Sequence, residues 1–300
     1  MHTHIGDLRS PSNMHRKPIT IEDLIARLND EGIVKAVLLP WPASPDDVQF
    51  PGLFQPQPDV ISQVRAARRY PERIIPFGNV DPRWGGNSSK TDFSWLFQRF
   101  VEMGYVGIGE ISANLLYDDP RVVNLFHQCG EWQFPVTIHA TGFAEGQYGL
   151  IDEPGSPHLL NLVQQSPDTI IIGHGPGFWA QISADVSPAD LLGYPKGPVR
   201  GEGMIPKLLR DFPNLYADIS AGSGYNALTR DPDYGIRFLN EFQDKLIFGT
   251  DVCFADEEGR MPHLNYLKER LASGDISQEV FDKITYRNAL KVLKRWSSER

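Results

Sequence analysis

The feature that most restricts the fold is an alternation between short apolar or β-branched runs and helix-length amphipathic segments along the 300-residue chain. This pattern is typical of repeated βα units around a parallel sheet. The strand-like runs lie at residues 1–4, 34–40, 74–80, 106–111, 136–140, 170–174, 215–219 and 246–250. A helical pattern follows each, at residues 20–29, 59–69, 91–103, 119–132, 157–165, 204–211, 232–243 and 262–272. Eight such units within about 250 residues predict an α/β fold of the (β/α)8 TIM-barrel type, with a doubly wound open sheet as the alternative.

The chain is expected to form a single domain over residues 1–300, because no internal repeat and no low-complexity linker interrupts the pattern. Local sequence signals support the start of the first predicted helix and the end of the second. Thr20 is an N-cap candidate with Asp23 three residues later, and Tyr70-Pro71 ends the second helix. Residues 278–296 add one or two C-terminal helices, which we expect to pack against the outside of the barrel.

Gly and Pro are concentrated after the predicted strands rather than before them, in residues 40–58, 81–89, 141–157 and 175–203. These segments are predicted loops, and in a TIM barrel the loops that follow the strands build the active-site face. The longest, 175–203, is large enough to act as a lid or a substrate wall. Four aromatic residues of these loops either line a pocket or pack the loops themselves: Trp41, Trp84, Phe143 and Trp179.

Charge and hydropathy exclude several classes of partner. A net charge of −9 and a pI near 5.4, without a run of five like charges, argue against binding to nucleic acid or an anionic membrane. No apolar stretch reaches about 18 residues and no secretory signal pattern is present, so we expect a cytoplasmic protein. Cys129 and Cys253 lack CxxC spacing and are expected to be reduced thiols. A small molecule is the expected partner, and the oligomeric state stays open, with a homo-oligomer as one option.

Two histidines at the start of the chain can bind one metal ion. His2 and His4 occupy positions i and i+2 of a strand, so both side chains point to the same face. An HxH pair alone is a weak signal, since a histidine or acid at a strand end can also cap a helix or bind a loop carbonyl. Four further candidate ligands, however, each end a different predicted strand: Glu110, His139, His174 and Asp251. Barrel strands converge at these ends, and imidazoles with carboxylates suit Zn, and also Mn, Fe or Co.

With these residues identified, the sequence resembles the amidohydrolase superfamily, in particular its amidohydrolase-related (amidohydrolase 2) group of TIM-barrel metal-dependent hydrolases and decarboxylases. The motifs that carry the resemblance are MHTHIGD at 1–7, GIGEIS at 107–112, VTIHATG at 136–142, IIIGHGPGFW at 170–179, LYADISAG at 215–222, LIFGTD at 246–251 and ITYRNALKVL at 284–293. The resemblance implies that His2, His4 and Asp251 hold one metal ion. His139 and His174 would hold a second, with Glu110 as the bridge. In relatives with one ion, His139 joins the first group and His174 becomes a catalytic side chain.

The resemblance also implies a mechanism in which a metal activates water and Asp251 acts as the general acid and base. The positive centre favours small anionic or carbonyl-rich substrates. Residues of the predicted loops that could contact such a substrate, and that are otherwise solvated surface side chains, are Arg83, Lys196, Arg200, Tyr225, Asn226 and Arg230. The remaining histidines are expected to be structural or exposed: His15, His127, His158 and His263.

Three functions compete. The first is hydrolysis of a lactone, ester or amide in a small carboxylated metabolite, which a metal-bound Glu110 and two ions favour. The second is decarboxylation of an aromatic or dienoic acid, with one ion and His174 as acid and base. The third is a scaffold without catalysis, although no ligand position is missing. One feature departs from the family pattern: only Met1 precedes HxH, which predicts either a truncated start or an unusually short first strand.

Overall fold

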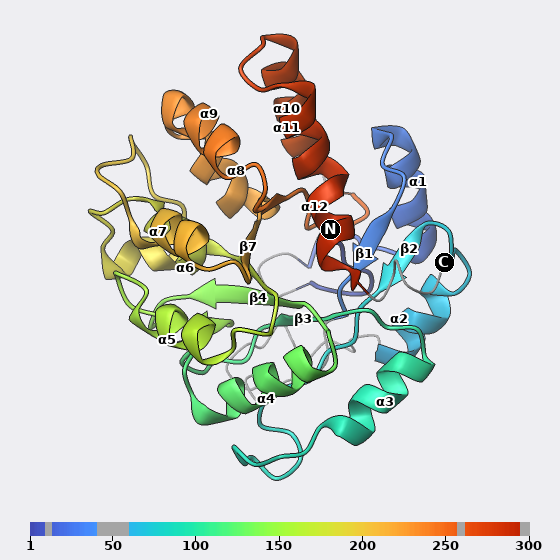
Figure 1. Cartoon of the computed structure of the whole chain (residues 1–300). Coiled ribbons are helices and arrows are strands. Elements are labelled where there is room, and N and C mark those ends of the chain that lie inside the picture. Colours follow the sequence, from blue (N-terminus) through green and yellow to red (C-terminus); the bar gives the residue numbers. More distant parts are fainter. Residues whose placement is uncertain (10–13, 41–59, 257–261, 295–300) are drawn as a thin grey trace.

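The computed structural model describes residues 1–9, 14–40, 60–256 and 262–294, and within them parallel strands form a closed ring (Figure 1). The strands are β1 (Ala36–Leu38), β2 (Ile74–Pro76), β3 (Ile108–Ile111), β4 (Val136–Thr141), β6 (Ile171–His174), β7 (Leu215–Asp218) and β8 (Leu246–Ile247). Parallel pairing joins β1 to β2 and runs in the order β3-β4-β6-β7-β8. A bridge from Gly78 to Ile108 connects β2 to β3. Thr3 bridges to both Leu38 and Val252, so the segment 1–4 closes the ring as its eighth member.

The predicted TIM barrel is therefore confirmed, and its first strand is reduced to a bridge at Thr3. The segment around Thr3 is nevertheless hydrogen-bonded on both sides, to β1 through Thr3 and to Asp251 through His2. Its N–H donates to the Val37 carbonyl at 3.1 Å, and its carbonyl accepts from the Leu39 N–H at 3.0 Å. The neighbouring His2 carbonyl accepts from the Asp251 N–H at 2.8 Å. These bonds hold the HxH segment between β1 and the residues that follow β8.

The helices surround the strands, as Figure 1 shows, and the predicted ones occur in the predicted order. They are α1 (Ile21–Glu31), α2 (Val60–Ala67), α3 (Ser94–Glu102), α4 (Pro120–Glu131), α5 (Pro157–Gln165), α7 (Met204–Asp211), α9 (Pro232–Glu241) and α10 (His263–Ala272). The capping box predicted at Thr20 and Asp23 is present at the start of α1. No helix of the described residues is both long and apolar enough to cross a membrane.

Two predicted loops contain secondary structure that the sequence did not indicate. The segment 141–157 includes β5 (Leu150–Ile151), which pairs with β4, and the segment 175–203 includes α6 (Pro176–Trp179) and two 3-10 turns, Ala180–Ile182 and Pro188–Leu192. Pro at the first helical position favours a helix start, so Gly and Pro there were wrongly taken as loop residues. A further helix, α8 (Ala221–Thr229), follows β7; its two glycines lower helix propensity, and burial of Ala227 and Leu228 outweighs that effect.

The aromatic residues of these loops differ in how deeply they are buried. Trp179 is buried, and its indole N–H donates to the Asp218 carbonyl at 3.0 Å, so it packs the loop rather than lining a pocket. Trp84 and Phe143 are exposed at 38% and 58%. Trp41 lies outside the described residues, as does most of the predicted loop 40–58.

The C-terminal segment covers one end of the barrel. It consists of α11 (Gln278–Asp282), a π-helical turn (Lys283–Arg287) and α12 (Asn288–Val292). Val292 and Leu293 belong to the same apolar cluster as Ile75, Ile172 and Ile247 from the strands. The Asn288 amide donates to the Leu246 carbonyl at 2.8 Å, where β8 begins. The predicted packing against the outside of the barrel is therefore wrong, because α12 closes the amino-terminal end of the ring.

Candidate metal centre

The two histidines of the first segment face each other at the carboxyl end of the barrel. Their Nε2 atoms lie 2.9 Å apart. Nδ1 of His4 faces the Leu39 carbonyl at 2.9 Å and therefore carries the hydrogen, while Nδ1 of His2 lies 2.7 Å from a carboxylate oxygen of Asp218. Two Nε2 lone pairs at this distance repel each other unless a cation or a proton lies between them. The arrangement therefore fits a pair of metal ligands.

Two carboxylates complete a four-atom group around this pair. Oδ1 of Asp251 lies 3.3 Å from Nε2 of His2 and 3.1 Å from Nε2 of His4. Oε2 of Glu110 lies 3.5 Å and 3.7 Å from the same two nitrogens. Ligands about 2.0–2.1 Å from a tetrahedral zinc ion are roughly 3.3 Å from one another. The five observed separations, from 2.9 to 3.7 Å, lie on both sides of that value, so both carboxylates lie at ligand spacing from the two histidines.

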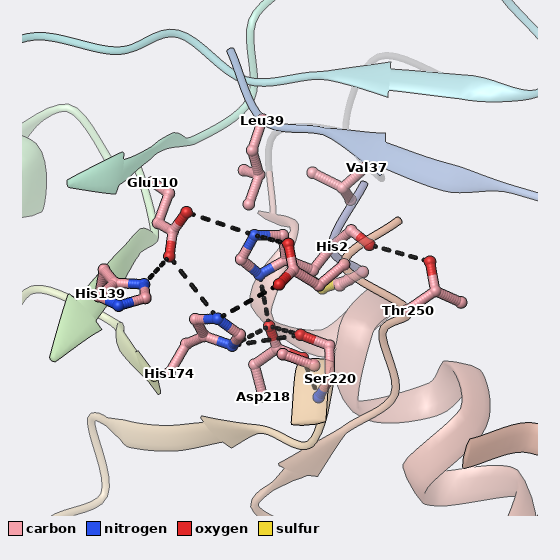
Figure 2. Close-up of polar contacts among 12 residues, drawn as sticks. His2, Val37, Leu39, Glu110, His139, His174, Asp218, Ser220 and Thr250 are labelled. Atoms are coloured by element: carbon pink, nitrogen blue, oxygen red, sulfur yellow. Dashed lines mark hydrogen bonds and ion pairs between the residues drawn. The ribbon is translucent and has the colours of Figure 1, made fainter. Parts of the chain in front are cut away.

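Glu110 also belongs to a second group of candidate ligands. Its other oxygen, Oε1, lies 2.7 Å from Nδ1 of His139 and 3.7 Å from Nε2 of His174. These three ligand atoms all lie within 4.8 Å of one another. Figure 2 shows the Glu110 carboxylate between His139 and the two histidines His2 and His174. The structure thus brings together all six residues that the sequence predicted as ligands, with Glu110 facing both groups.

Asp218 is a site residue that the sequence analysis missed. It ends β7, and its Oδ2 lies 2.7 Å from Nδ1 of His2 and 3.3 Å from Nδ1 of His174 (Figure 2). The Ser220 hydroxyl donates to the same oxygen at 2.7 Å. A carboxylate in this position fixes the ring orientation and tautomer of a metal-binding histidine. The signal was present in the LYADIS motif, where an acid ends a strand as Glu110 and His174 do.

A glycine makes room for this contact. A Cβ atom on Gly249 would lie 2.8 Å from Oδ1 of Asp218 and 3.0 Å from Cβ of His2. Any larger residue there would push the two apart, so Gly249 is part of what brings His2 and Asp218 into hydrogen-bond distance.

The cluster is electrostatically suited to a cation. Burial raises the pKa of Glu110, but the charges of His139 and His2 outweigh burial and hold that pKa well below its usual range. The pKa of Asp218 is likewise raised by burial and is held low by hydrogen bonds from His174 and His2. Burial lowers the pKa of His2, and the charges of Asp251 and Glu110 outweigh it and raise that pKa. These shifts favour the charged forms of the acids, so the cluster attracts a cation.

Asp251 is the ligand closest to solvent. Its side chain is 20% exposed, whereas the side chains of His2, His4, Glu110 and His174 are at most 5% exposed. Its φ of 57° lies in the left-handed region, which Asp tolerates better than most residues. Sγ of Cys253 lies 3.8 Å from Oδ1 of Asp251, and together with His4 these residues form a further group of potential ligands. Among these candidate ligands Asp251 is therefore the one most accessible to solvent.

The six predicted substrate-contacting residues lie in varied surroundings. Arg83 pairs with Asp81 at 2.6 Å, Lys196 is exposed, and Arg200 is exposed beside Asp185 at 3.8 Å. Burial lowers the pKa of Arg230, whose Nε and Nη2 atoms are buried without a hydrogen-bond partner. Tyr225 and Asn226 belong to α8. The Tyr225 ring packs against the His263 ring, with ring centroids 5.4 Å apart. Contacts of these residues with a substrate stay a prediction.

Of the other four histidines, His15 is exposed and three have partners outside the cluster. His127 contacts the Gln165 carbonyl, His158 lies 2.8 Å from Asp118, and His263 lies 2.9 Å from the Ala221 carbonyl. These contacts are compatible with the structural roles that we expected.

Sixty-two chains of solved structures match this fold. An amidohydrolase from Burkholderia multivorans with bound zinc has a TM-score of 0.59 at 13% identity, over 98% of this chain and 97% of the other. A probable 2-pyrone-4,6-dicarboxylic acid hydrolase from Acinetobacter baumannii, with citric acid bound, has a TM-score of 0.55 at 15% identity, over 98% and 97%. A 2,6-dihydroxybenzoate decarboxylase from Rhizobium has a TM-score of 0.55 at 16% identity, over 98% and 96%.

At these identities the structural likeness shows the fold alone. No curated protein sequence matches the chain at the significance required. The family itself is shown by sequence: the model of the Amidohydrolase family (Amidohydro_2) matches residues 62–295, which is well over half of the chain. The superfamily resemblance found in the motifs is thereby confirmed, and the chain belongs to the amidohydrolase family.

Proposed function

We propose that this protein is a metal-dependent hydrolase that cleaves a carbonyl-centred bond, such as a lactone, ester or amide, in a small carboxylated metabolite. The observation that carries the proposal is the position of Glu110. One of its oxygens faces His2 and His4 and the other faces His139 and His174. A carboxylate that reaches two groups of ligands is suited to bridge two ions, and paired ions support hydrolysis.

The residues divide into two ligand sets. His2, His4 and Asp251 would hold one divalent ion and His139 and His174 a second, with Glu110 shared. Zinc is the first candidate, since the donors are imidazole and carboxylate and the Burkholderia relative contains zinc; manganese and iron suit the same donors. Such ions supply a hydroxide nucleophile near neutral pH and polarise the carbonyl under attack.

The protein side chains direct proton transfer and orientation. Asp251 is the most exposed of the carboxylates, so it can accept a proton from the attacking water and return it to the leaving group. Asp218 holds the rings of His2 and His174 in place from behind. The binding of citric acid by the Acinetobacter relative agrees with an anionic substrate.

Decarboxylation of an aromatic or dienoic acid is the second candidate, and one observation favours it. His174 has Nδ1 at 3.2 Å from the Ser220 hydroxyl and 3.3 Å from Asp218, so its Nε2 faces Glu110 and Asp251, at 3.7 Å and 3.9 Å. An imidazole held in this way can deliver the proton that replaces a departing carboxylate. The Rhizobium relative catalyses such a reaction.

Metal content and a substrate panel test the proposal together. Metal-stripped protein is reloaded with zinc or manganese, analysed for ions per chain, and assayed on lactones, esters, amides and aromatic carboxylic acids. We expect two ions per chain and hydrolysis, and Glu110→Gln should leave one ion. One ion per wild-type chain with release of CO2 would establish the second candidate instead. Less than one ion per chain after reloading would refute both.

A further inference from the structure

Tyr148 occupies a fixed position beside the cluster. Its ring packs against the ring of His139, with centroids 4.3 Å apart and a tilt of 36°. The next residue, Gly149, donates its N–H to the Ser112 carbonyl at 2.8 Å and leads directly into β5. Gly149 has a φ of 109°, and a Cβ there would lie 2.7 Å from Cδ2 of His139. The backbone at Gly149 therefore lies in close contact with His139, and its hydrogen bond to Ser112 fixes the position of the neighbouring Tyr148.

The His139 ring connects Tyr148 to the cluster, because Nδ1 of His139 lies 2.7 Å from Oε1 of Glu110. Burial raises the pKa of Tyr148, and the charges of Glu110 and Asp251 raise it further. The residue is only partly buried. A phenol with an ordinary pKa near 10 is a neutral hydrogen-bond donor at neutral pH.

A second phenol approaches from another segment. Tyr194 follows the 3-10 turn Pro188–Leu192, and its ring is 54% exposed. Burial of its inner part and the charge of Asp251 raise its pKa. A Cβ on Gly222, at the start of α8, would lie 3.0 Å from the Tyr194 hydroxyl. Tyr194 is thus a second phenol, from another segment, whose pKa responds to the charge of Asp251.

We propose that Tyr148 is a substrate-binding residue, whose hydroxyl donates a hydrogen bond to a carboxylate or carbonyl oxygen of a substrate bound beside Glu110 and Asp251. This inference rests on the proposed function, because it assumes that the cluster holds a metal and an anionic substrate. The inference adds to that function the residue that would recognise the substrate, which is the neutral phenol of Tyr148 next to His139.

The chemistry of the cluster explains why a neutral donor suits this position. A cationic side chain here would pair with Glu110 or Asp251 and compete with the metal for them. A phenol orients an anionic oxygen without neutralising a ligand. A site that donates a hydrogen bond also discriminates against substrates that lack the acceptor.

The test separates the hydroxyl group from the ring. Tyr148→Phe removes only the hydroxyl, and Tyr148→Leu also removes the packing against His139. Tyr286→Phe is the matched control, because Tyr286 is 47% exposed and lies on the C-terminal π-helical turn. Each protein is loaded with Co²⁺, its cobalt content is measured, and benzoate is titrated while the visible absorption of the bound cobalt is followed.

We expect Tyr148→Phe to keep the wild-type cobalt content and to bind benzoate about 10- to 100-fold more weakly, which is the usual effect of losing a hydrogen bond to a charged group. Tyr286→Phe should match the wild type. Equal benzoate affinity in Tyr148→Phe and wild type, no benzoate binding to the wild type, or weakening only in Tyr148→Leu would overturn the inference. Selective benzoate binding without hydrolysis of any panel substrate would refute the proposed hydrolase and leave Tyr148 in its role.

Discussion

The two ends of the barrel use the same strands for different purposes. In β6, Ile172 belongs to the apolar cluster with α12, and His174, two residues later on the same face, belongs to the cluster of candidate metal ligands. In β7, Tyr216 and Asp218 are divided in the same way. In both strands, an apolar residue that packs at the amino end is therefore followed, two residues later, by a candidate functional residue at the carboxyl end.

This difference indicates that stability and activity are separable along the barrel axis. The amino end is closed by side chains without charge, such as Leu293, which is fully buried. The carboxyl end collects buried acids and imidazoles, whose burial is unfavourable unless they are paired or bind a metal. Changes at the carboxyl end should affect turnover and metal binding, and changes at the amino end should affect the free energy of unfolding.

The largest effect is expected from Asp251→Asn. The amide keeps the shape but cannot accept a proton, and general acid and base catalysis contributes about 10²- to 10⁴-fold, so kcat should fall by that factor. The measurement is kcat on the substrate that the panel identifies. Asp256→Asn is the control and should keep wild-type turnover, because Asp256 is a partly exposed aspartate five residues after Asp251 that pairs with Arg16 at 3.3 Å. An Asp251→Asn variant with more than a tenth of wild-type kcat would contradict the role of Asp251.

Substitutions at the amino end of the barrel should change the free energy of unfolding and leave metal binding unchanged. Leu293→Ala removes a fully buried side chain from the α12 cluster and should lower the free energy of unfolding by about 2–5 kcal/mol. Urea denaturation at unchanged m-value measures this loss. Leu290→Ala, on a residue that is 47% exposed in the same helix, should change it by less than about 0.5 kcal/mol. A fall in metal content of Leu293→Ala that exceeds the unfolded fraction would show that the two ends are coupled.

The sequence predicted the barrel and the six ligand positions for one physical reason. Parallel βα units close only in a few ways, and strand ends of a barrel meet, so His2 and Asp251 could be placed together although 249 positions separate them. Alternation and strand-end chemistry are local signals that a single sequence contains.

The parts that were missed depend on tertiary contacts. Asp218 acts through its distance from His2, which Gly249 permits, and the strand-end position of Asp218 in the sequence does not give that distance. The position of α12 depends on the shape of the apolar opening that it fills, and a helical pattern alone does not tell the inside of a barrel from the outside. Helix α8 forms although its glycines disfavour it, because its apolar residues pack in the core.

A third experiment compares two kinds of buried acid at the carboxyl end. Asp152 has no imidazole among its hydrogen-bond donors: it accepts from the N–H groups of Glu153, His158 and Leu159, and burial raises its pKa from 3.8 to about 6. Between these values the folded protein binds more protons than the unfolded chain, so stability decreases as pH rises through this window. The difference in unfolding free energy between wild type and Asp152→Asn should fall by about 2 kcal/mol from pH 4 to pH 6.

This measurement needs chelator throughout, so that metal release does not contribute to the pH dependence. A difference between wild type and variant that stays constant from pH 4 to pH 6 would show that Asp152 is ionised over the whole range, as the histidine-paired acids are.

The smallest effect tests whether Asp218 acts through the histidines. Asp218→Asn weakens the acceptor at 2.7 Å from Nδ1 of His2, and loss of such a partner typically lowers metal affinity about 10- to 100-fold. Competition with a chromophoric chelator measures the affinity for zinc. Asp118→Asn breaks a similar pair at 2.8 Å, with His158 outside the cluster, and should leave zinc affinity unchanged. Because both variants remove one carboxylate charge, equal losses would mean that net charge rather than histidine orientation sets the affinity, and the distinction drawn here between the metal cluster and its surroundings would not hold.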